Sequence, residues 1–144
     1  MQKFILAIAV LLALGPGSVT AQTCSTTDRL DQTAIKAALV DKWACAKDGV
    51  DMWNERLTGS GNSGPFKECH SGLSTGPDPI DNNKGTWSTN NNPGTITYAY
   101  GGSFTYTYYV YGTASPYTFC RVSDAKIYAV HITSCPPPTL NTCP

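Results

Sequence analysis

Residues 95–112, TITYAYGGSFTYTYYVYG, decide the fold of this chain. β-Branched and aromatic residues fill both halves of the stretch, and such residues favour strands. The Gly-Gly-Ser at its centre favours a tight turn. The stretch is therefore predicted to form an antiparallel hairpin.

The length of the turn sets which residues of the hairpin face each other. A two-residue turn pairs Tyr98 with Thr105 and mixes both faces of the hairpin. A three-residue turn at 101–103 pairs Tyr98 with Tyr106 and separates an aromatic face from a threonine face. We therefore predict the three-residue turn, with an inner row formed by Ile96, Tyr98, Tyr100, Phe104, Tyr106, Tyr108 and Val110.

The rest of the chain is predicted to form one helix and further short strands. An apolar stripe of Leu30, Ala34, Ile35, Ala38 and Leu39 predicts a helix at about 28–40, capped by Asp28. Strand-forming runs lie at 42–46, 51–57, 65–70, 85–88, 116–122 and 126–132, although 50–57 also permits a helix. Together these elements predict a mainly β fold, an antiparallel meander of 7–8 short strands that forms a small barrel or curved sheet.

The beginning of the chain and its cysteines indicate export. Residues 1–21 place Lys3 before a short apolar run and end in a small-residue cleavage site, which is typical of a signal peptide. Residues 22–144 are then predicted to form a single domain with a Pro-rich tail at 135–144, in a secreted or periplasmic location. An even number of cysteines in a small exported domain predicts three disulfides, with the pairing left open, among Cys24, Cys45, Cys69, Cys120, Cys135 and Cys143.

Composition and charge exclude several classes of partner. Only 14% of the 144 residues are charged. After removal of the leader, nine basic side chains oppose ten acidic ones, so no basic footprint for nucleic acid exists. The apolar run of the leader is too short to span a bilayer, and no later segment is longer. We therefore expect neither a nucleic-acid partner nor a membrane span.

Four short segments carry a resemblance to a known group of proteins. They are DRLDQ at 28–32, GTWS at 85–88, YAYGGS at 98–103 and YTFC at 117–120. With these segments the chain resembles small exported bacterial proteins of unknown function, which are themselves similar to short lipocalin-like (calycin) domains. The resemblance implies the fold alone, a small β barrel, and it assigns no residue a role.

The candidates for catalysis, cofactor binding and metal binding are weak. The GSGNSG at 59–64 matches a dinucleotide-binding pattern but is followed by Pro65 and an extended run, so it is interpreted as a turn. Two distant histidines, His70 and His131, make a poor acid–base or metal pair, although Glu68 shares a strand face with His70. A glycosidase-like pair of acids could come from Asp51, Glu55, Glu68, Asp78 and Asp81, which are interpreted instead as solvated loop charges. No enzyme, cofactor or metal site is predicted.

The aromatic residues carry the functional prediction. We expect a non-enzymatic binding module for a small apolar or aromatic ligand, with a cavity lined by Trp87, Tyr98, Tyr106 and Phe119. The alternative is a structural subunit of an extracellular assembly, because residues 85–120 contain no Asp, Glu, Lys or Arg to protect their strand edges. A closed barrel would abolish those edges. Tyr109 and Tyr111, on the threonine face, are the predicted surface contacts for a ligand or partner.

Overall fold

The computed structural model describes residues 24, 27–49, 51–72, 76–77, 81–101 and 104–133. For residues 51, 69–72, 76–77, 81–83 and 133, it describes only the backbone. The predicted signal peptide at 1–21 and the Pro-rich tail at 135–144 lie outside the described residues.

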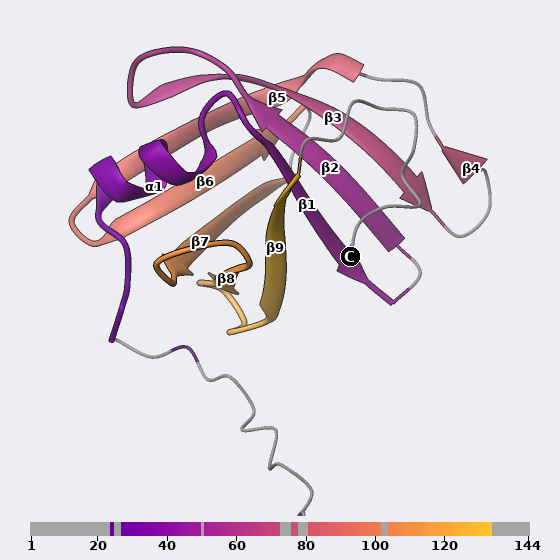
Figure 1. Ribbon diagram of the computed structural model, residues 1–144. Coiled ribbons are helices and arrows are strands. Elements are labelled where there is room, and N and C mark those ends of the chain that lie inside the picture. The colour runs from indigo at the N-terminus through magenta and orange to yellow at the C-terminus, as the bar shows by residue number, and fades with distance from the viewer. Residues whose placement is uncertain are drawn as a thin grey trace, which may run out of the picture.

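The described residues form one helix and nine strands (Figure 1). Their bounds are α1 Gln32–Leu39, β1 Trp43–Asp48, β2 Asp51–Leu57, β3 Ser63–Gly72, β4 Gly76–Pro77, β5 Asp81–Asn91, β6 Gly94–Tyr100, β7 Thr105–Tyr111, β8 Tyr117–Arg121 and β9 Ile127–Thr133. Residues 51–57, where the sequence also permits a helix, are therefore strand.

Eight of the strands close into a barrel. Their order is β2-β1-β9-β8-β7-β6-β5-β3, and β2 pairs with β3 to complete the ring. All of these pairings are antiparallel, and the short β4 adds to the end of β3. The predicted antiparallel meander is confirmed, and the structure selects the barrel over the open curved sheet.

The hairpin of β6 and β7 has the predicted register. Tyr98 pairs with Tyr106, and Thr97 pairs with Thr107, whose hydroxyl oxygen lies 2.9 Å from that of Thr97. Of the predicted inner row, Phe104 is wrongly placed, because its side chain is 65% exposed. It precedes the first residue of β7 and lies beyond the rim, where no opposing wall can cover it.

Helix α1 begins later than predicted. Asp31, and not Asp28, caps it: the Asp31 side chain accepts a hydrogen bond from the Ala34 amide at 2.8 Å. Asp28 has a φ of 61° and stands outside the helix. The buried helical residues, Ile35, Ala38 and Leu39, come from the predicted stripe. Within the described ranges, no helix has the length and apolar character to cross a bilayer.

The cap gives a first test of this boundary. Replacing Asp31 by alanine leaves the Ala34 amide without its acceptor, so we expect the free energy of unfolding to fall by about 1 kcal/mol. Asparagine caps helices as well as aspartate does, so Asp31→Asn is the matched control and should be nearly neutral. Urea denaturation measures both variants. An alanine variant as stable as the wild type would contradict the assigned helix start.

The helix closes one end of the barrel. It packs against β5 and β6, and its Gln32 amide donates a hydrogen bond to the Thr89 carbonyl at 2.8 Å (Figure 1). The side chains that fill this end are almost completely inaccessible to solvent and form a packed apolar core: Ile35, Leu39, Leu57, Phe66, Trp87, Ile96 and Val110. This end of the barrel therefore has no room for a ligand.

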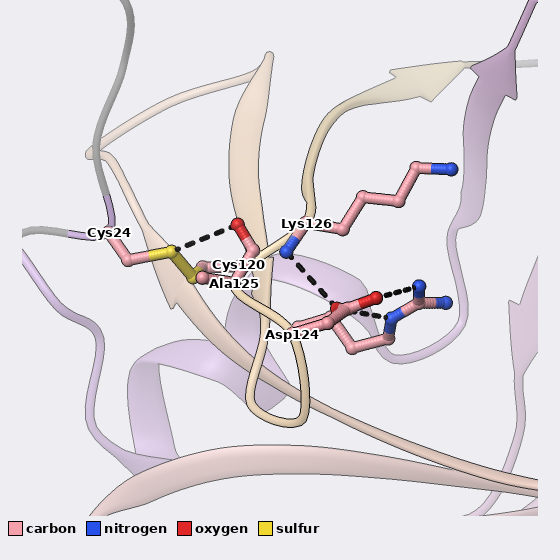
Figure 2. Close-up of a disulfide and its surroundings, with 6 residues drawn as sticks. Cys24, Cys120, Asp124, Ala125 and Lys126 are labelled. Atoms are coloured by element: carbon pink, nitrogen blue, oxygen red, sulfur yellow. Dashed lines mark hydrogen bonds and ion pairs between the residues drawn. A yellow bond between two sulfur atoms is a disulfide. The ribbon is translucent and has the colours of Figure 1, made fainter.

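The segment before the helix crosses the barrel wall, and we call Cys24 with residues 27–31 the strap. Its Leu30 amide donates a hydrogen bond to the Val110 carbonyl at 2.8 Å, and Arg29 forms an isolated antiparallel β-bridge with Tyr111. Figure 2 shows how a disulfide joins Cys24 to Cys120 beside the turn between β8 and β9. The Cα atoms of the two cysteines are 5.8 Å apart, an ordinary separation for a disulfide.

Two of the three predicted disulfides have support at the described residues. Cys24 pairs with Cys120, and Cys45 is also disulfide-bonded. The side chain of Cys69 lies outside the described part of the chain, as do Cys135 and Cys143 entirely. The full set of three bridges therefore stays a prediction.

The closed barrel changes the basis of the assembly hypothesis. Strands β5 to β8, which cover most of 85–120, each pair with a neighbour on both sides. The end of β7 extends past its pairing with β6, and there the strap pairs with it at Val110 and Tyr111. The described strands in this region thus present no unpaired edge of the kind on which the hypothesis relied. Association through the threonine face stays a prediction.

Candidate functional site

The barrel end opposite α1 is open and forms a cleft, which we call the mouth. Strands β1, β3, β6 and β8 end there, and β2, β5, β7 and β9 begin there. The cleft has a volume of about 320 Å³. The residues that line it are Asp48, Trp53, Glu68, Tyr100, Tyr106, Tyr108, Arg121, Lys126 and Tyr128.

A smaller cavity lies directly below the mouth, and we call it the inner cavity. Its volume is about 20 Å³, enough for a water molecule or one small polar group. Its lining consists of Ala44, Ala46, Trp53, Glu55, Tyr98, Tyr100, Tyr108, Phe119, Tyr128 and Val130. Four aromatic residues line both spaces, so the inner cavity is the floor of the mouth: Trp53, Tyr100, Tyr108 and Tyr128.

The period of the strands explains why these side chains meet inside. Successive residues of a strand point to opposite faces, so every second side chain enters the barrel. In β2 the inward positions are Trp53, Glu55 and Leu57, and in β6 they are Ile96, Tyr98 and Tyr100. One acid of β2 therefore shares the interior with the aromatic row of the hairpin.

The aromatic walls are packed on one another before any ligand arrives. Tyr108 lies edge-on to both Tyr98 and Tyr128, with ring centroids 6.0 Å apart in each pair. Trp53 meets Tyr128 at 5.6 Å in the same T-shaped manner. Edge-to-face pairs of this kind are favourable and hold the rings in their positions. The walls are thus pre-organised.

Glu55 is the acid at the floor of the mouth. Its side chain is only 5% exposed, and the Tyr100 hydroxyl donates a short hydrogen bond to its Oε1. Burial raises the pKa of Glu55 from 4.5 to about 8; the bond from Tyr100 opposes this rise, and Glu68 adds to it. Glu55 is therefore mostly protonated and uncharged at neutral pH, and its interpretation as a solvated loop charge is wrong.

Glu68 faces Glu55 across the ladder of β2 and β3 and is 7% exposed. Its carboxylate oxygen lies 2.8 Å from the Lys84 ammonium of β5. The interpretation of Glu68 as a solvated loop charge is wrong as well, because the barrel wall places it inside the mouth. The two acids differ in their partners: Glu68 has a cation, whereas Glu55 has the neutral hydroxyl of Tyr100.

Tyr98 brings an unsatisfied polar atom to the same floor. Its side chain is 2% exposed, and its hydroxyl has no hydrogen-bond partner among the described residues. Burial raises the pKa of the Tyr98 hydroxyl well above its ordinary value, and the nearby Glu55 adds to that rise. A buried hydroxyl without a partner is costly to stability, so the inner cavity is suited to a polar group that pairs with it.

The rim of the mouth carries charges that are already paired. Arg121 forms a two-pronged ion pair with Asp124, and Lys126 pairs with Asp48. Figure 2 shows Asp124 and Lys126 on the turn beside the disulfide. The hydrogen bonds from Arg121 lower the pKa of Asp124 to about 2. The rim therefore presents matched charges, with the Arg121 guanidinium over the Tyr106 ring at 5.4 Å.

Three of the four predicted ligand-binding residues come together at this end. Tyr98 and Phe119 line the inner cavity, and Tyr106 lines the mouth. Trp87 lines neither of these spaces. It is 1% exposed in the packed core beside the helix, and its indole nitrogen donates to the Thr58 carbonyl at 2.9 Å.

The two predicted surface contacts differ from each other. Tyr109 is half-buried on the outer face, with the Arg29 guanidinium 5.0 Å from its ring centroid. Tyr111 is 7% exposed, since the strap pairs beside it, so it offers almost no surface to a partner. The hairpin pattern placed both outside the aromatic row but gave no sign of the strap.

The remaining candidates are the glycine-rich run and the two histidines. Residues 59–62 lie in the connection between β2 and β3, and Ser63 begins β3. His131 is half-buried in β9, and the side chain of His70 is not among those described. Within the described ranges, no three His, Cys, Asp or Glu side chains gather in a way that could hold a metal ion.

The main residues that sequence reasoning missed are Glu55 and its neighbours in β2. The signal was present in DMWNERL at 51–57, where Glu55 alternates in phase with Trp53 and Leu57. A charge at an inward position of an amphipathic strand is unusual and marks either a partner or a site.

Comparison of the chain with protein-family models, with curated proteins and with solved structures finds no match. Its function is therefore inferred from the mouth and the inner cavity themselves.

Proposed function

We propose that this protein is an exported, non-enzymatic binding module that takes a small ligand with an aromatic or apolar body into the mouth of its barrel. The observation that carries the proposal is the cleft of about 320 Å³, walled by aromatic rings and continued by the inner cavity. Pockets of this size and lining typically hold small molecules.

Three further observations support the proposal. The rings are held in place by edge-to-face contacts, so little entropy is lost when a ligand binds between them. The closed eight-stranded barrel has the architecture that the resemblance to lipocalin-like domains implies, and the disulfide at Cys24 suits an oxidising compartment.

Tryptophan fluorescence tests the proposal because the three tryptophans lie in different places. Trp53 lines the mouth, Trp43 begins β1 at the helix end, and Trp87 is packed in the core. We expect a phenol, which is not excited at the red edge of tryptophan absorption, to change the emission of the wild type and of Trp43→Phe in a saturable way. The same titration of Trp53→Phe should show almost no change in emission.

Two outcomes would contradict the proposal. One is the absence of any saturable change across a panel of aromatic compounds, fatty acids, haem and oligosaccharides. The other is a response that persists in Trp53→Phe and disappears in Trp43→Phe, which would place the ligand at the helix end.

A further inference from the structure

We propose that the ligand is a primary amine with an aromatic body, whose ammonium group enters the inner cavity between Glu55 and Tyr98 while its ring lies in the mouth against Trp53 and Tyr128. This inference rests on the binding function proposed above. It adds the chemical class of the ligand and the residues that select it.

The size and the polar atoms of the inner cavity fit an ammonium group. At about 20 Å³, the cavity holds a group of the size of one water molecule. The Tyr98 hydroxyl is without a partner among the described residues, and Glu55 carries a second carboxyl oxygen besides the one bound by Tyr100. An ammonium donates three hydrogen bonds, so it can satisfy the Tyr98 oxygen and the Glu55 carboxyl together.

The remaining surface of the cavity is also suited to a cation. The rings of Tyr108 and Phe119 form part of its wall, with centroids 5.6 Å apart. Aromatic faces attract cations through their quadrupole, most strongly where water is excluded. A cation at this point is thus stabilised by rings as well as by hydrogen bonds.

Among the described acids of the mouth, Glu55 is the one that could pair with a cationic ligand, because the others already form ion pairs. Arg121 pairs with Asp124, Lys126 with Asp48 and Lys84 with Glu68, so these six groups balance. Glu55 has the Tyr100 hydroxyl as its hydrogen-bond partner, and among the described side chains no Lys or Arg forms an ion pair with it, although the charge of Lys84 lowers its pKa somewhat. A ligand that brings one positive charge to the floor therefore complements the one acid left over.

Other head groups fit the floor less well. A plain hydrocarbon would leave the Tyr98 hydroxyl unpaired, as it is in the free protein, and would gain no hydrogen bond from it. A carboxylate could accept a hydrogen bond from the protonated Glu55, but its charge would be buried near the Glu68 carboxylate, whose Lys84 partner is already engaged. A neutral alcohol satisfies the hydroxyl but gains no ion pair.

Binding of the amine should release a proton. Glu55 is mostly protonated before binding, because burial holds its pKa at about 8. When an ammonium arrives, the carboxylate form is favoured and the Glu55 proton leaves to solvent, so the affinity should rise with pH below 8. The ionisable groups nearest Glu55 are Glu68 of β3, Lys84 of β5, Tyr98 and Tyr100 of β6, Tyr108 of β7 and Tyr128 of β9, whereas β1 places Ala44 and Ala46 beside it. The rim of the mouth adds Asp48 of β1, Tyr106 of β7, Arg121 of β8 and Lys126 before β9.

Three probes that share one phenylalkyl body separate the contributions of body and head group. They are 2-phenylethylamine, 2-phenylethanol and 3-phenylpropionate, each titrated calorimetrically into the full-length protein. At pH 7 we expect the amine to bind at least about tenfold more tightly than the alcohol, and the carboxylate to bind most weakly. Between pH 6 and 7 the affinity for the amine should rise about tenfold, and that for the alcohol should stay constant.

The Glu55→Gln variant is the decisive comparison. Its amide oxygen can still accept the bond from Tyr100, so the floor keeps its shape. We expect the variant to lose both the preference for the amine over the alcohol and the pH dependence. Far-ultraviolet circular dichroism shows that the variant is folded.

The outcomes distinguish failure of the amine inference from failure of the binding function. If the alcohol or the carboxylate binds as tightly as the amine, or if Glu55→Gln keeps the preference, the amine inference is wrong and the binding function stands. If none of the three probes binds and a phenol does not bind either, both are wrong.

Discussion

The wild-type protein is expected to lose roughly 5 kcal/mol of unfolding free energy as the pH rises from 4.5 to 8, whereas Glu55→Gln should not show this loss. In that interval the folded protein keeps a proton on Glu55 that the unfolded chain releases. Because the folded state binds more protons, its stability falls as the pH rises. The fall ends as the pH passes the folded pKa of about 8, where Glu55 ionises inside the barrel.

Urea denaturation at half-unit steps of pH measures this difference, and Glu68→Gln is the matched control. Glu68 has Lys84 as its partner, so its replacement should lower stability at neutral pH. The downward slope should remain but end at a lower pH, because Glu68 contributes to the raised pKa of Glu55. Asp124, whose pKa of about 2 is set by Arg121, titrates below the interval and does not disturb the comparison. Parallel profiles for the wild type and Glu55→Gln would mean that Glu55 is already charged in the folded protein.

Removal of the disulfide of the strap is expected to have the other large effect. Cys24 and Cys120 are 96 residues apart, and a bridge that closes so long a loop restricts the unfolded chain strongly. We expect Cys24→Ser with Cys120→Ser to lower the free energy of unfolding by about 4 kcal/mol. The loss should also expose Tyr111, which lies beside Arg29 under the strap.

Chemical denaturation without reductant measures this loss, and near-ultraviolet circular dichroism reports on the tyrosine. Ser123→Ala is a suitable control, because Ser123 is exposed on the same turn and its replacement should change stability by less than about 0.5 kcal/mol. A double variant within about 1 kcal/mol of the wild type would show that the strap does not depend on its bridge.

The hairpin shows how far local patterns reach. The register of β6 and β7 followed from the separation of tyrosines and threonines, because only one turn length sorts them onto two faces. The meander of strands followed in the same way from alternation and turns. Closure of the barrel did not, since the pairing of β2 with β3 on one side and with β1 on the other depends on the curvature of all eight strands together.

Three residues lie in surroundings that their strand patterns do not indicate, because elements beyond their own strand determine those surroundings. Phe104 has the phase of the inner row but lies past the rim, so it is exposed. Tyr111 has the phase of the outer face but is covered, because a segment distant in sequence pairs beside it. Trp87 points inward as expected, yet it lies at the helix end, where α1 fills the space.

Glu55 illustrates the same limit at the candidate site. Its inward phase in β2 is readable from Trp53 and Leu57, but its lack of an ion pair among the described residues is not. Lys84, whose charge lowers the Glu55 pKa, lies on another strand and pairs with Glu68 instead. The sequence could predict an acid inside the barrel, and only the three-dimensional arrangement shows that this acid is neutral and accompanied by the unpaired hydroxyl of Tyr98.

The most direct test of a neutral acid at the floor of the mouth is a pH titration of the Glu55 side-chain carboxyl carbon by ¹³C nuclear magnetic resonance, with its signal assigned from the spectrum of Glu55→Gln. If Glu55 is neutral in the folded protein, we expect a single transition with a midpoint at about pH 8. A midpoint near 4.5, the ordinary value for glutamate, would contradict a neutral Glu55, because the carboxyl would then be charged and solvated at neutral pH.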